Sequence, residues 1–136
     1  MTRVTEYQQR LSELLPGGEV HLSGSASVPG LDPGDLDLVV LVDDVAAAAD
    51  ALRAEYPVLY PEEWRDDWAA FRVPGSPQVD IVVTRPGTLG DKHHRLAWQL
   101  LAESPDLLDQ YRALKATPED YELRKRKFFE RVVAQL

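Results

Sequence analysis

The spacing of apolar residues along the chain changes between two periods, and each period predicts a different kind of element. In five segments apolar residues recur every three or four positions, as on one face of a helix. These predicted helices are residues 5–15, 45–55, 89–103, 105–115 and a last one that starts at Thr117-Pro118 and runs to the end. Alternating or continuous short apolar runs predict strands at residues 19–22, 35–42, 68–73 and 78–84, with a shorter one at 58–60. The order is helix, mixed sheet, helices, which predicts an α+β fold with a C-terminal helical lobe.

Turn and cap residues divide these elements. Pro16-Gly17-Gly18 ends the first helix, and Pro74 to Pro77 forms the turn of a β-hairpin. Asp43 or Asp44 can cap the second helix, and Ser104-Pro105, like Thr117-Pro118, follows the cap-then-proline pattern of a helix start. Residues 26–34 are expected to form an ordered loop. We therefore predict one domain over residues 1–136, with a core at about 1–88 and a helical segment at about 89–136.

The predicted strand 35–42 carries two aspartates at its start and is otherwise apolar. Asp35 and Asp37 are two positions apart, so on a strand their carboxylates share one face of the sheet. Their repulsion favours a cation between them, and hard oxygen ligands suit Mg²⁺. Gly24-Ser25, just upstream, can bring backbone N–H groups and a hydroxyl to phosphates. The segment predicts a site for a metal-bound nucleotide.

A third aspartate, Asp80, interrupts the apolar run of the strand 78–84. If that strand lies beside the strand 35–42, Asp80 reaches the same site as Asp35 and Asp37. Three carboxylates around a divalent metal match nucleotidyl transfer, in which one carboxylate orients or deprotonates the attacking hydroxyl. Aspartates at strand ends are more often turn or cap residues, and what favours the metal site is the ordered set of motifs.

Charge and composition narrow the functional classes. The 136-residue chain has a net charge of −8, which argues against a broad basic surface for long nucleic acids but allows a small anion carried by a metal. It has no cysteine, which excludes disulfides and thiolate chemistry. The apolar runs are too short to span a membrane, and no signal-peptide pattern opens the chain, so we expect a cytoplasmic protein without membrane contact.

These motifs resemble those of known proteins at two levels. The set Gly24-Ser25, Asp35-Leu36-Asp37-Leu38 and Asp80 resembles the nucleotidyltransferase superfamily that includes DNA polymerase β and small antibiotic nucleotidyltransferases. Over nearly the whole chain, further segments look like the GrpB-like family. These segments are His21 to Leu31, His94 to Trp98, Ser104 to Leu107, Tyr111 to Lys115 and the tail from Tyr121 to Phe129.

The superfamily resemblance implies roles for four residues. Ser25 would contact the terminal phosphates of a nucleoside triphosphate, and Asp35 and Asp37 would ligate Mg²⁺, with Mn²⁺ as a possible substitute. Asp80 would be the third ligand and the general base. The chain departs from the GrpB-like pattern at Pro33-Gly34-Asp35, where relatives carry an apolar stretch with a lysine. It therefore looks closer to a complete superfamily triad than those relatives do.

Basic and aromatic residues of the predicted helices supply further candidates. Lys92 and Arg95, in a cluster with His93 and His94, could clamp the triphosphate or the acceptor. The alternative, which the pattern favours, is a solvated helix face with one histidine packed. Tyr111 and Lys115 lie one turn apart and could stack on a base and bind phosphate, although such a tyrosine is more often a core residue. The run Lys125 to Lys127 reads as a solvated helix face.

We therefore predict a Mg²⁺-dependent nucleotidyltransferase that uses a nucleoside triphosphate and a hydroxyl-bearing acceptor. A catalytically degenerate regulatory or antitoxin-like module is the first alternative, and the short chain favours it. A metal-dependent phosphohydrolase that uses the same carboxylates is the second. The base, the acceptor and the oligomeric state stay open at this point.

Overall fold

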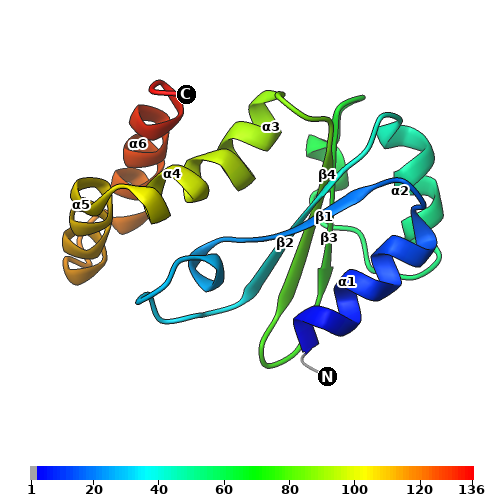
Figure 1. Cartoon of the computed structure of the whole chain (residues 1–136), viewed down its shortest axis with the longest axis horizontal. Helices are drawn as coiled ribbons and strands as arrows, with labels where there is room; N and C mark the ends of the chain where they lie inside the picture. The colour runs from blue at the N-terminus through cyan, green and yellow to red at the C-terminus, as the bar shows by residue number, and fades with distance from the viewer. Residues whose placement is uncertain (1–2) are drawn as a thin grey trace.

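A four-stranded mixed sheet forms the centre of the computed structural model, which describes residues 3–136 (Figure 1). Its strands are β1 (Glu19–Ser23), β2 (Leu36–Leu41), β3 (Trp68–Val73) and β4 (Val79–Thr84). Residues 1 and 2 of the predicted domain lie outside the described part of the chain. The strand order is β1-β2-β4-β3, so β2 and β4 are the interior strands. They run parallel to each other, while β1 and β3 pair with them in the antiparallel sense.

Six α-helices and three shorter helical turns surround the sheet in the described residues. The α-helices are α1 (Arg3–Leu14), α2 (Val45–Arg53), α3 (Leu89–Asp91), α4 (Ala97–Glu103), α5 (Pro105–Ala116) and α6 (Tyr121–Val133). The short turns are the 3₁₀ segments η1 (Ser25–Ser27) and η2 (Pro61–Glu63) and the π-helical turn η3 (Lys92–Leu96). The predicted α+β fold, with a mixed sheet and a C-terminal helical lobe, is confirmed.

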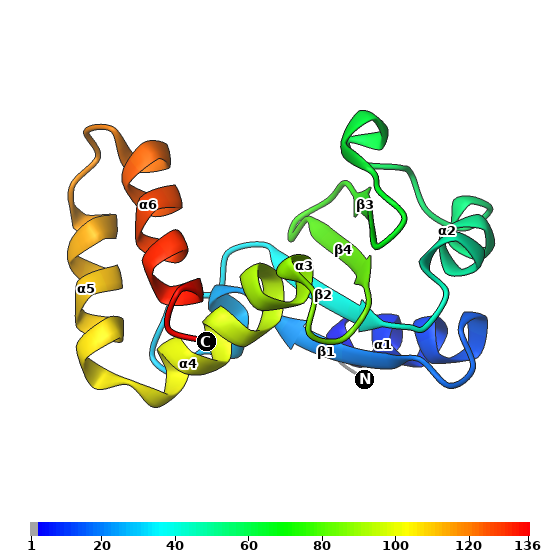
Figure 2. The same ribbon diagram turned by 90° about the horizontal axis from the view of Figure 1, so that it is seen from above.

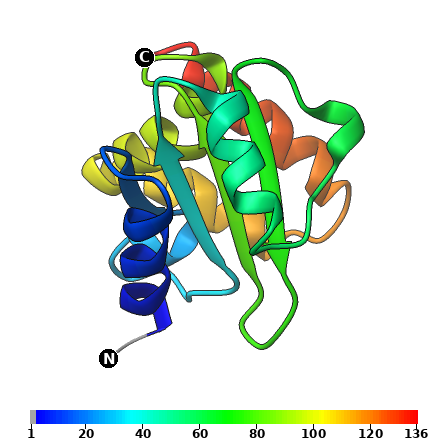
Figure 3. The ribbon, with the colours of Figure 1, turned by 90° about the vertical axis from the view of Figure 1, so that its right-hand side faces the viewer.

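One face of the sheet forms the main hydrophobic core. Leu38 and Val40 of β2 and Ile81 of β4 are almost completely buried there, against Leu11 of α1 and Leu52 of α2. Figure 3 shows α1 and α2 in front of the sheet and the C-terminal helices behind it. Asp44 caps α2 by accepting a hydrogen bond from the N–H of Ala47 (3.0 Å), which decides between the two predicted caps.

The C-terminal helices form a second hydrophobic cluster at one end of the molecule (Figure 2). Tyr111 of α5 and Phe128 of α6 are almost completely buried in it. The Trp98 ring of α4 lies 4.9 Å from that of Phe129, between centroids. Burial of these aromatic side chains holds α4, α5 and α6 together as a lobe beside the sheet.

Three predicted elements differ from the observed ones. Residues 58–60 form no strand: Val58 makes an isolated bridge to Phe71, and Tyr60 is left-handed with φ of 48°, which ends any pairing. The last helix begins at Tyr121 rather than at Thr117-Pro118, because left-handed Asp120 (φ 52°) forms a turn first. The helix 89–103 is present but contains the π-helical turn η3.

Candidate functional site

A row of polar residues crosses all four strands on the face opposite the main core. Ser23 of β1 pairs with Asp37 of β2, Asp37 pairs with Asp80 of β4, and Asp80 pairs with Arg72 of β3. Register partners on neighbouring strands direct their side chains to the same face, so these four side chains form one line. The predicted neighbourhood of Asp37 and Asp80 is confirmed, and it arises because the hairpin returns β4 to lie parallel to β2.

Asp37 lies in a tight and partly buried position. The space beside its carboxylate depends on Gly24, since a Cβ placed on Gly24 would lie only 2.3 Å from Oδ2 of Asp37. Gly24 also has a φ of 65°, which favours glycine. Burial, and then the nearby Asp80 carboxylate, raise the pKa of Asp37 to about 6, while Lys125 acts in the opposite direction. Asp37 is thus a carboxylate whose ionised form a cation would stabilise.

Asp80 has a partner within the protein. Nε and Nη2 of Arg72 donate to its two carboxylate oxygens at 2.8 Å and 2.9 Å, and Nε2 of Gln78 donates to Oδ1 at 3.3 Å. This bidentate pair raises the pKa of Arg72 further above its ordinary value. Any cation at Asp80 therefore shares the carboxylate with Arg72.

Asp35 stands just before β2 and is exposed, so the strand begins one residue later than predicted. Its Oδ1 accepts a hydrogen bond from the backbone N–H of Gln78 (3.2 Å), which ties the start of β2 to β4. Among residues 3–136, no group of three or more His, Cys, Asp or Glu is arranged to hold a metal ion. The structure thus brings Asp37 and Asp80 together and leaves Asp35 at their margin.

Two neighbouring cavities open on the polar row. The larger one, here called the carboxylate cavity, has a volume of about 450 Å³ and is lined by all three aspartates together with Ser25, Tyr111 and Lys115. The smaller one, here called the side cavity, measures about 330 Å³ and extends along β2 and β4 toward α4 and α6. Gly24, Asp37, Asp80, Trp98 and Lys125 border the side cavity. Seven of the nine predicted site residues line one cavity or the other.

Tyr111 and Lys115 differ in how accessible they are. Only 2% of the Tyr111 surface is exposed, and burial, followed by the neighbouring Tyr121, raises the pKa of its hydroxyl. Lys115 is exposed, with Nζ 5.8 Å from the centroid of the Tyr111 ring. Tyr111 therefore holds the lobe together and presents at most an edge to the carboxylate cavity.

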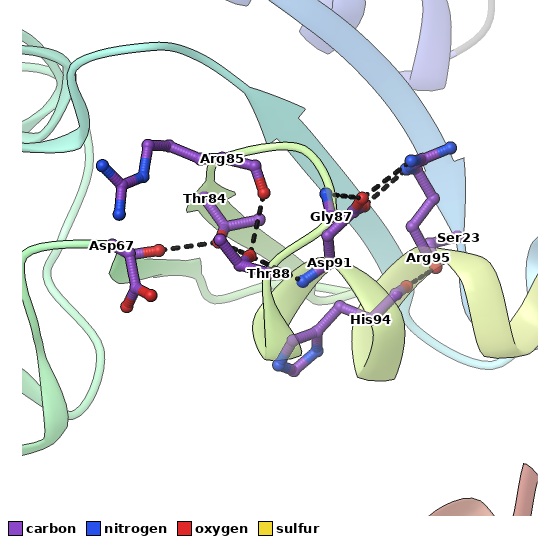
Figure 4. Close-up of polar contacts among 9 residues, drawn as sticks. All are labelled: Ser23, Asp67, Thr84, Arg85, Gly87, Thr88, Asp91, His94 and Arg95. Carbon is purple, nitrogen blue, oxygen red and sulfur yellow. Dashed lines mark hydrogen bonds and ion pairs between the residues drawn. The ribbon is translucent and has the colours of Figure 1, made fainter. Parts of the chain in front are cut away.

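Lys92 and Arg95 lie elsewhere, and Arg95 has a structural partner (Figure 4). Nε and Nη2 of Arg95 donate to the fully buried Asp91 carboxylate at 2.6 Å and 2.8 Å, and the N–H of Gly87 donates to it at 2.9 Å. Burial opposes the charge on Asp91, but these hydrogen bonds outweigh it and lower the pKa of the carboxyl. Arg95 thus fixes the start of the helical lobe.

His94 links the same helical turn to the sheet. Its backbone oxygen accepts a hydrogen bond from the Ser23 hydroxyl, and its ring lies 6.0 Å from that of Trp68. Burial lowers the pKa of His94 to about 4, so the ring is neutral at pH 7. The expectation of one packed histidine in this cluster is confirmed.

Arg72, Lys125 and Arg126 border the cavities although none was predicted as a site residue. The hairpin register contained the signal for Arg72, since it places Arg72 opposite Asp80. Lys125 lies three and four residues before the buried Phe128 and Phe129, hence on the inner side of α6. The predicted solvated face is wrong for Lys125, which is half-buried, and holds for the exposed Arg126 and Lys127.

Taken together, the mixed sheet and its polar row define an α+β protein with a carboxylate-lined site between a sheet and a helical lobe. The sequence model of the GrpB protein family matches residues 2–135, so the chain belongs to the GrpB family. The crystal structure of the conserved protein GrpB from Enterococcus faecalis is similar, with a TM-score of 0.75 and 20% sequence identity. That alignment covers 98% of this chain and 92% of the other.

Two larger structures also share part of the fold. A cytoplasmic RNA terminal U-transferase matches with a TM-score of 0.47 and 24% identity, over 72% of this chain and 32% of that one. The Cid1 poly(U) polymerase matches with a TM-score of 0.43 and 20% identity, over 72% and 33%. This chain thus spans about a third of either. A comparison with curated protein sequences gives no match. Within residues 3–136, no helix has the length and apolarity to cross a membrane.

Proposed function

We propose that this protein is a Mg²⁺-dependent nucleotidyltransferase that moves a nucleotidyl group from a nucleoside triphosphate to a hydroxyl-bearing acceptor. The observation that carries the proposal is the pairing of Asp37 with Asp80 in register on the two interior strands, facing a cavity. A partly buried carboxylate beside a second one destabilises a fold when it ionises, so a function is the simplest reason to keep Asp37 there. We propose the cytoplasm as its location, where nucleoside triphosphates are available.

The residues present fit a divalent metal held by two carboxylates. Asp37 and Asp80 offer hard oxygen donors on one sheet face, and burial and then the Asp80 carboxylate raise the pKa of Asp37, an effect that a bound cation would offset. Mg²⁺ commonly takes one or two protein carboxylates and completes its shell with water and substrate phosphates. When bound, the metal would neutralise phosphate charge and favour ionisation of the attacking hydroxyl. Asp35 then acts from the margin, where it holds Gln78.

The chain offers cations for the phosphates around the carboxylate cavity. Lys115 of α5 and Lys125 of α6 line it from the lobe, and Arg72 lines it from the sheet. Ser25 lines the same cavity from η1, next to Gly24. These groups would bind and orient the triphosphate, which is the main protein contribution to phosphoryl-type transfer.

In the proposed reaction, the acceptor hydroxyl oxygen forms a bond to the α-phosphorus of the triphosphate. The bond from the α-phosphorus to the oxygen that bridges it to the β-phosphorus breaks, and pyrophosphate leaves with that electron pair. The hydroxyl proton passes to Asp80, the predicted base. Because Arg72 already donates to both carboxylate oxygens of Asp80, we expect positioning of the hydroxyl to contribute more than proton transfer.

Isothermal titration of the full chain with ATP, GTP, CTP and UTP tests this function, each with Mg²⁺, with Mn²⁺ and with EDTA. We expect metal-dependent binding of at least one nucleotide, and its loss in Asp37→Ala. Asp50→Ala is the matched control, because Asp50 is exposed on α2 at the other face of the sheet. Absence of metal-dependent binding in the wild type, or equal loss in both variants, would contradict the proposal.

A second candidate function has one observation in its favour. The bidentate pair between Arg72 and Asp80 already neutralises one of the two carboxylates, as expected if the chain binds nucleotide without turning it over. Such a regulatory module would bind a nucleotide and release no product. Incubation with a nucleotide labelled on its α-phosphate separates the two functions. A labelled acceptor together with pyrophosphate indicates transfer, and the absence of any product indicates a regulatory module. Release of free phosphate, assayed separately, would instead indicate hydrolysis.

A further inference from the structure

The side cavity lies where a second substrate would meet the proposed nucleotide. It shares Asp37, Asp80 and Lys125 with the carboxylate cavity, so molecules in the two cavities would face the same carboxylates. Its volume of about 330 Å³ is near the lower end for small-molecule sites. A single sugar phosphate or a molecule of similar size fits this volume, whereas a folded macromolecule does not.

The side cavity has apolar walls and a cationic border. Val39 and Val82 line its floor on the sheet, and the packed rings of Trp98 and Phe129 line one side. Arg126 borders this cavity and does not line the carboxylate cavity. Within the described part of the chain, its guanidinium has no hydrogen bond or ion pair. A guanidinium without a protein partner beside a cavity is suited to bind an anion from solution.

The charge distribution of the chain supports an anionic ligand at this border. Of the 13 residues of α6, five are basic and two are acidic, although the whole chain carries −8. The basic ones are Arg124, Lys125, Arg126, Lys127 and Arg131. A small anion at the Arg126 border would meet Lys125 and Arg126, with Glu122 and the two sheet aspartates as the acidic members of the lining, whereas a polynucleotide would extend its phosphates over the acidic remainder.

We propose that the side cavity binds the acceptor of the transfer, and that the acceptor is a small alcohol carrying a phosphate group that Arg126 recognises. The role of this ligand as the acceptor rests on the proposed function. The binding of a small phosphorylated alcohol in the side cavity does not depend on it. The apolar floor takes the carbon skeleton, Lys125 and Arg126 bind the phosphate, and the free hydroxyl faces the pair Asp37 and Asp80. Arg126 is then a specificity residue rather than a catalytic one.

Binding of matched probes tests the inference with the full chain. Glycerol 3-phosphate and ribose 5-phosphate are titrated beside glycerol, ribose and a short single-stranded RNA with a free 3′-hydroxyl. Each titration is run with Mg²⁺ alone and with Mg²⁺ plus the nucleotide that binds best. We expect the phosphorylated probes to bind more tightly than their neutral counterparts, and Arg126→Gln to weaken them by about tenfold or more.

Lys127→Gln is the matched control, since it removes the same charge from the next position of α6, outside the side cavity. It should change the affinity less than about twofold, because Lys127 is exposed like Arg126 but does not border the side cavity, so its charge acts on the ligand only through screening solvent. Three results would overturn the inference: phosphorylated and neutral probes that bind equally or not at all, equal effects of the two variants, or tighter binding of the RNA. Failure of the proposed function is seen separately, as loss of metal-dependent nucleotide binding.

Discussion

At the scale of single residues, Asp37 connects the stability of the fold with its proposed function. Its carboxylate is partly buried beside a second carboxylate, and its pKa of about 6 records the free energy needed to ionise it there. In the unfolded chain the same group ionises near its ordinary value of 3.8. The fold therefore loses stability as the pH rises through this window, and a bound cation would restore it.

Removing the charge of Asp37 should make the protein more stable at neutral pH. Below about pH 4 the carboxyl is protonated in both states, so Asp37→Asn should change the free energy of unfolding little. Above pH 6 the ionised carboxylate destabilises the wild type only, and we expect the variant to be more stable by about 1–3 kcal/mol. Urea denaturation at pH 3.5, 5 and 7.5 measures this difference. A variant equally or less stable at every pH would show that burial does not penalise this charge.

Gly24 should be as sensitive to substitution as the aspartate beside it. In Gly24→Ala the new methyl group would have to displace the Asp37 carboxylate, and a φ of 65° adds about 1–2 kcal/mol of backbone strain. We expect a small loss of stability and a loss of metal-dependent nucleotide binding of about tenfold or more. Gly87→Ala is the control, because it has a similar φ of 78° and open space around its Cβ position. Backbone strain alone would affect both variants equally. Unchanged nucleotide binding in Gly24→Ala would show that Gly24 is not part of the site.

At the scale of elements, local patterns predicted the fold well where the local sequence determines the structure. The hairpin, the alternation in β2 and the capped starts of α2 and α5 all follow from nearby residues, such as Ser104, which accepts a hydrogen bond from the N–H of Leu107. The start of α6 did not follow from its proline, because Arg124 bonds the carbonyls of Thr117 and Glu119 and holds a turn there. The preference of proline for a helix start lost at that position to hydrogen bonds from a side chain in the first turn of α6.

The candidate site likewise has one part that the sequence predicted and one part that it did not. A shared site for Asp37 and Asp80 was predicted on the condition that their strands are neighbours, and the structure meets that condition and adds the register. The role of Lys125 was not predicted, because the surroundings of a long charged side chain depend on how helices pack. The role of Arg95 was not predicted either, although its partner is local. Arg95 found Asp91 one turn earlier on its own helical segment, a spacing visible in the sequence as i and i+4.

The buried pair of Arg95 and Asp91 should therefore affect stability and not binding. Arg95→Met leaves the Asp91 carboxylate fully buried with one remaining hydrogen bond, from Gly87. We expect a loss of about 3–5 kcal/mol in the free energy of unfolding, measured in urea. The affinity for nucleotide and Mg²⁺, titrated under conditions where the variant is folded, should stay within about twofold of the wild type. The double variant Asp91→Asn with Arg95→Met should recover part of the stability. A specific loss of nucleotide binding would instead show that Arg95 is a binding residue.

At the scale of the whole molecule, the site lies between two separate hydrophobic clusters. The main cluster draws its C-terminal members from β4, and the second begins at Ala97 of α4. The sheet carries the carboxylates, whereas the lobe carries Lys115, Lys125 and Arg126. Most of the cations thus stand across this space from Asp37 and Asp80, while Arg72 lines it from the sheet and Glu122 from the lobe. The distance between the lobe cations and the two aspartates depends on how the lobe packs, so ligand affinity should depend on the integrity of the lobe.

Loosening the lobe should weaken binding without unfolding the sheet. Phe129 is 8% exposed and packs against Trp98, Tyr111 and Phe128. Phe129→Ala removes these contacts, and we expect a cost of about 3–5 kcal/mol within the lobe. Amide hydrogen exchange should accelerate in α5 and α6 first, while α1 and α2 stay protected. Nucleotide affinity should fall, because Lys115 and Lys125 lose their fixed positions opposite Asp37.

Phe71→Ala provides the comparison, since Phe71 is fully buried in the main cluster against Trp64. Its loss should accelerate exchange throughout the chain, because the sheet supports every other element. If Phe129→Ala also accelerates exchange everywhere to the same extent, the lobe and the sheet unfold as one cooperative unit. Faster exchange confined to the lobe would instead mean that the lobe opens as one body. A ligand that bridges the sheet and the lobe would then slow amide exchange in α5 and α6. That protection should disappear in Asp37→Ala, because the bridge needs the carboxylate on the sheet as much as the cations on the lobe.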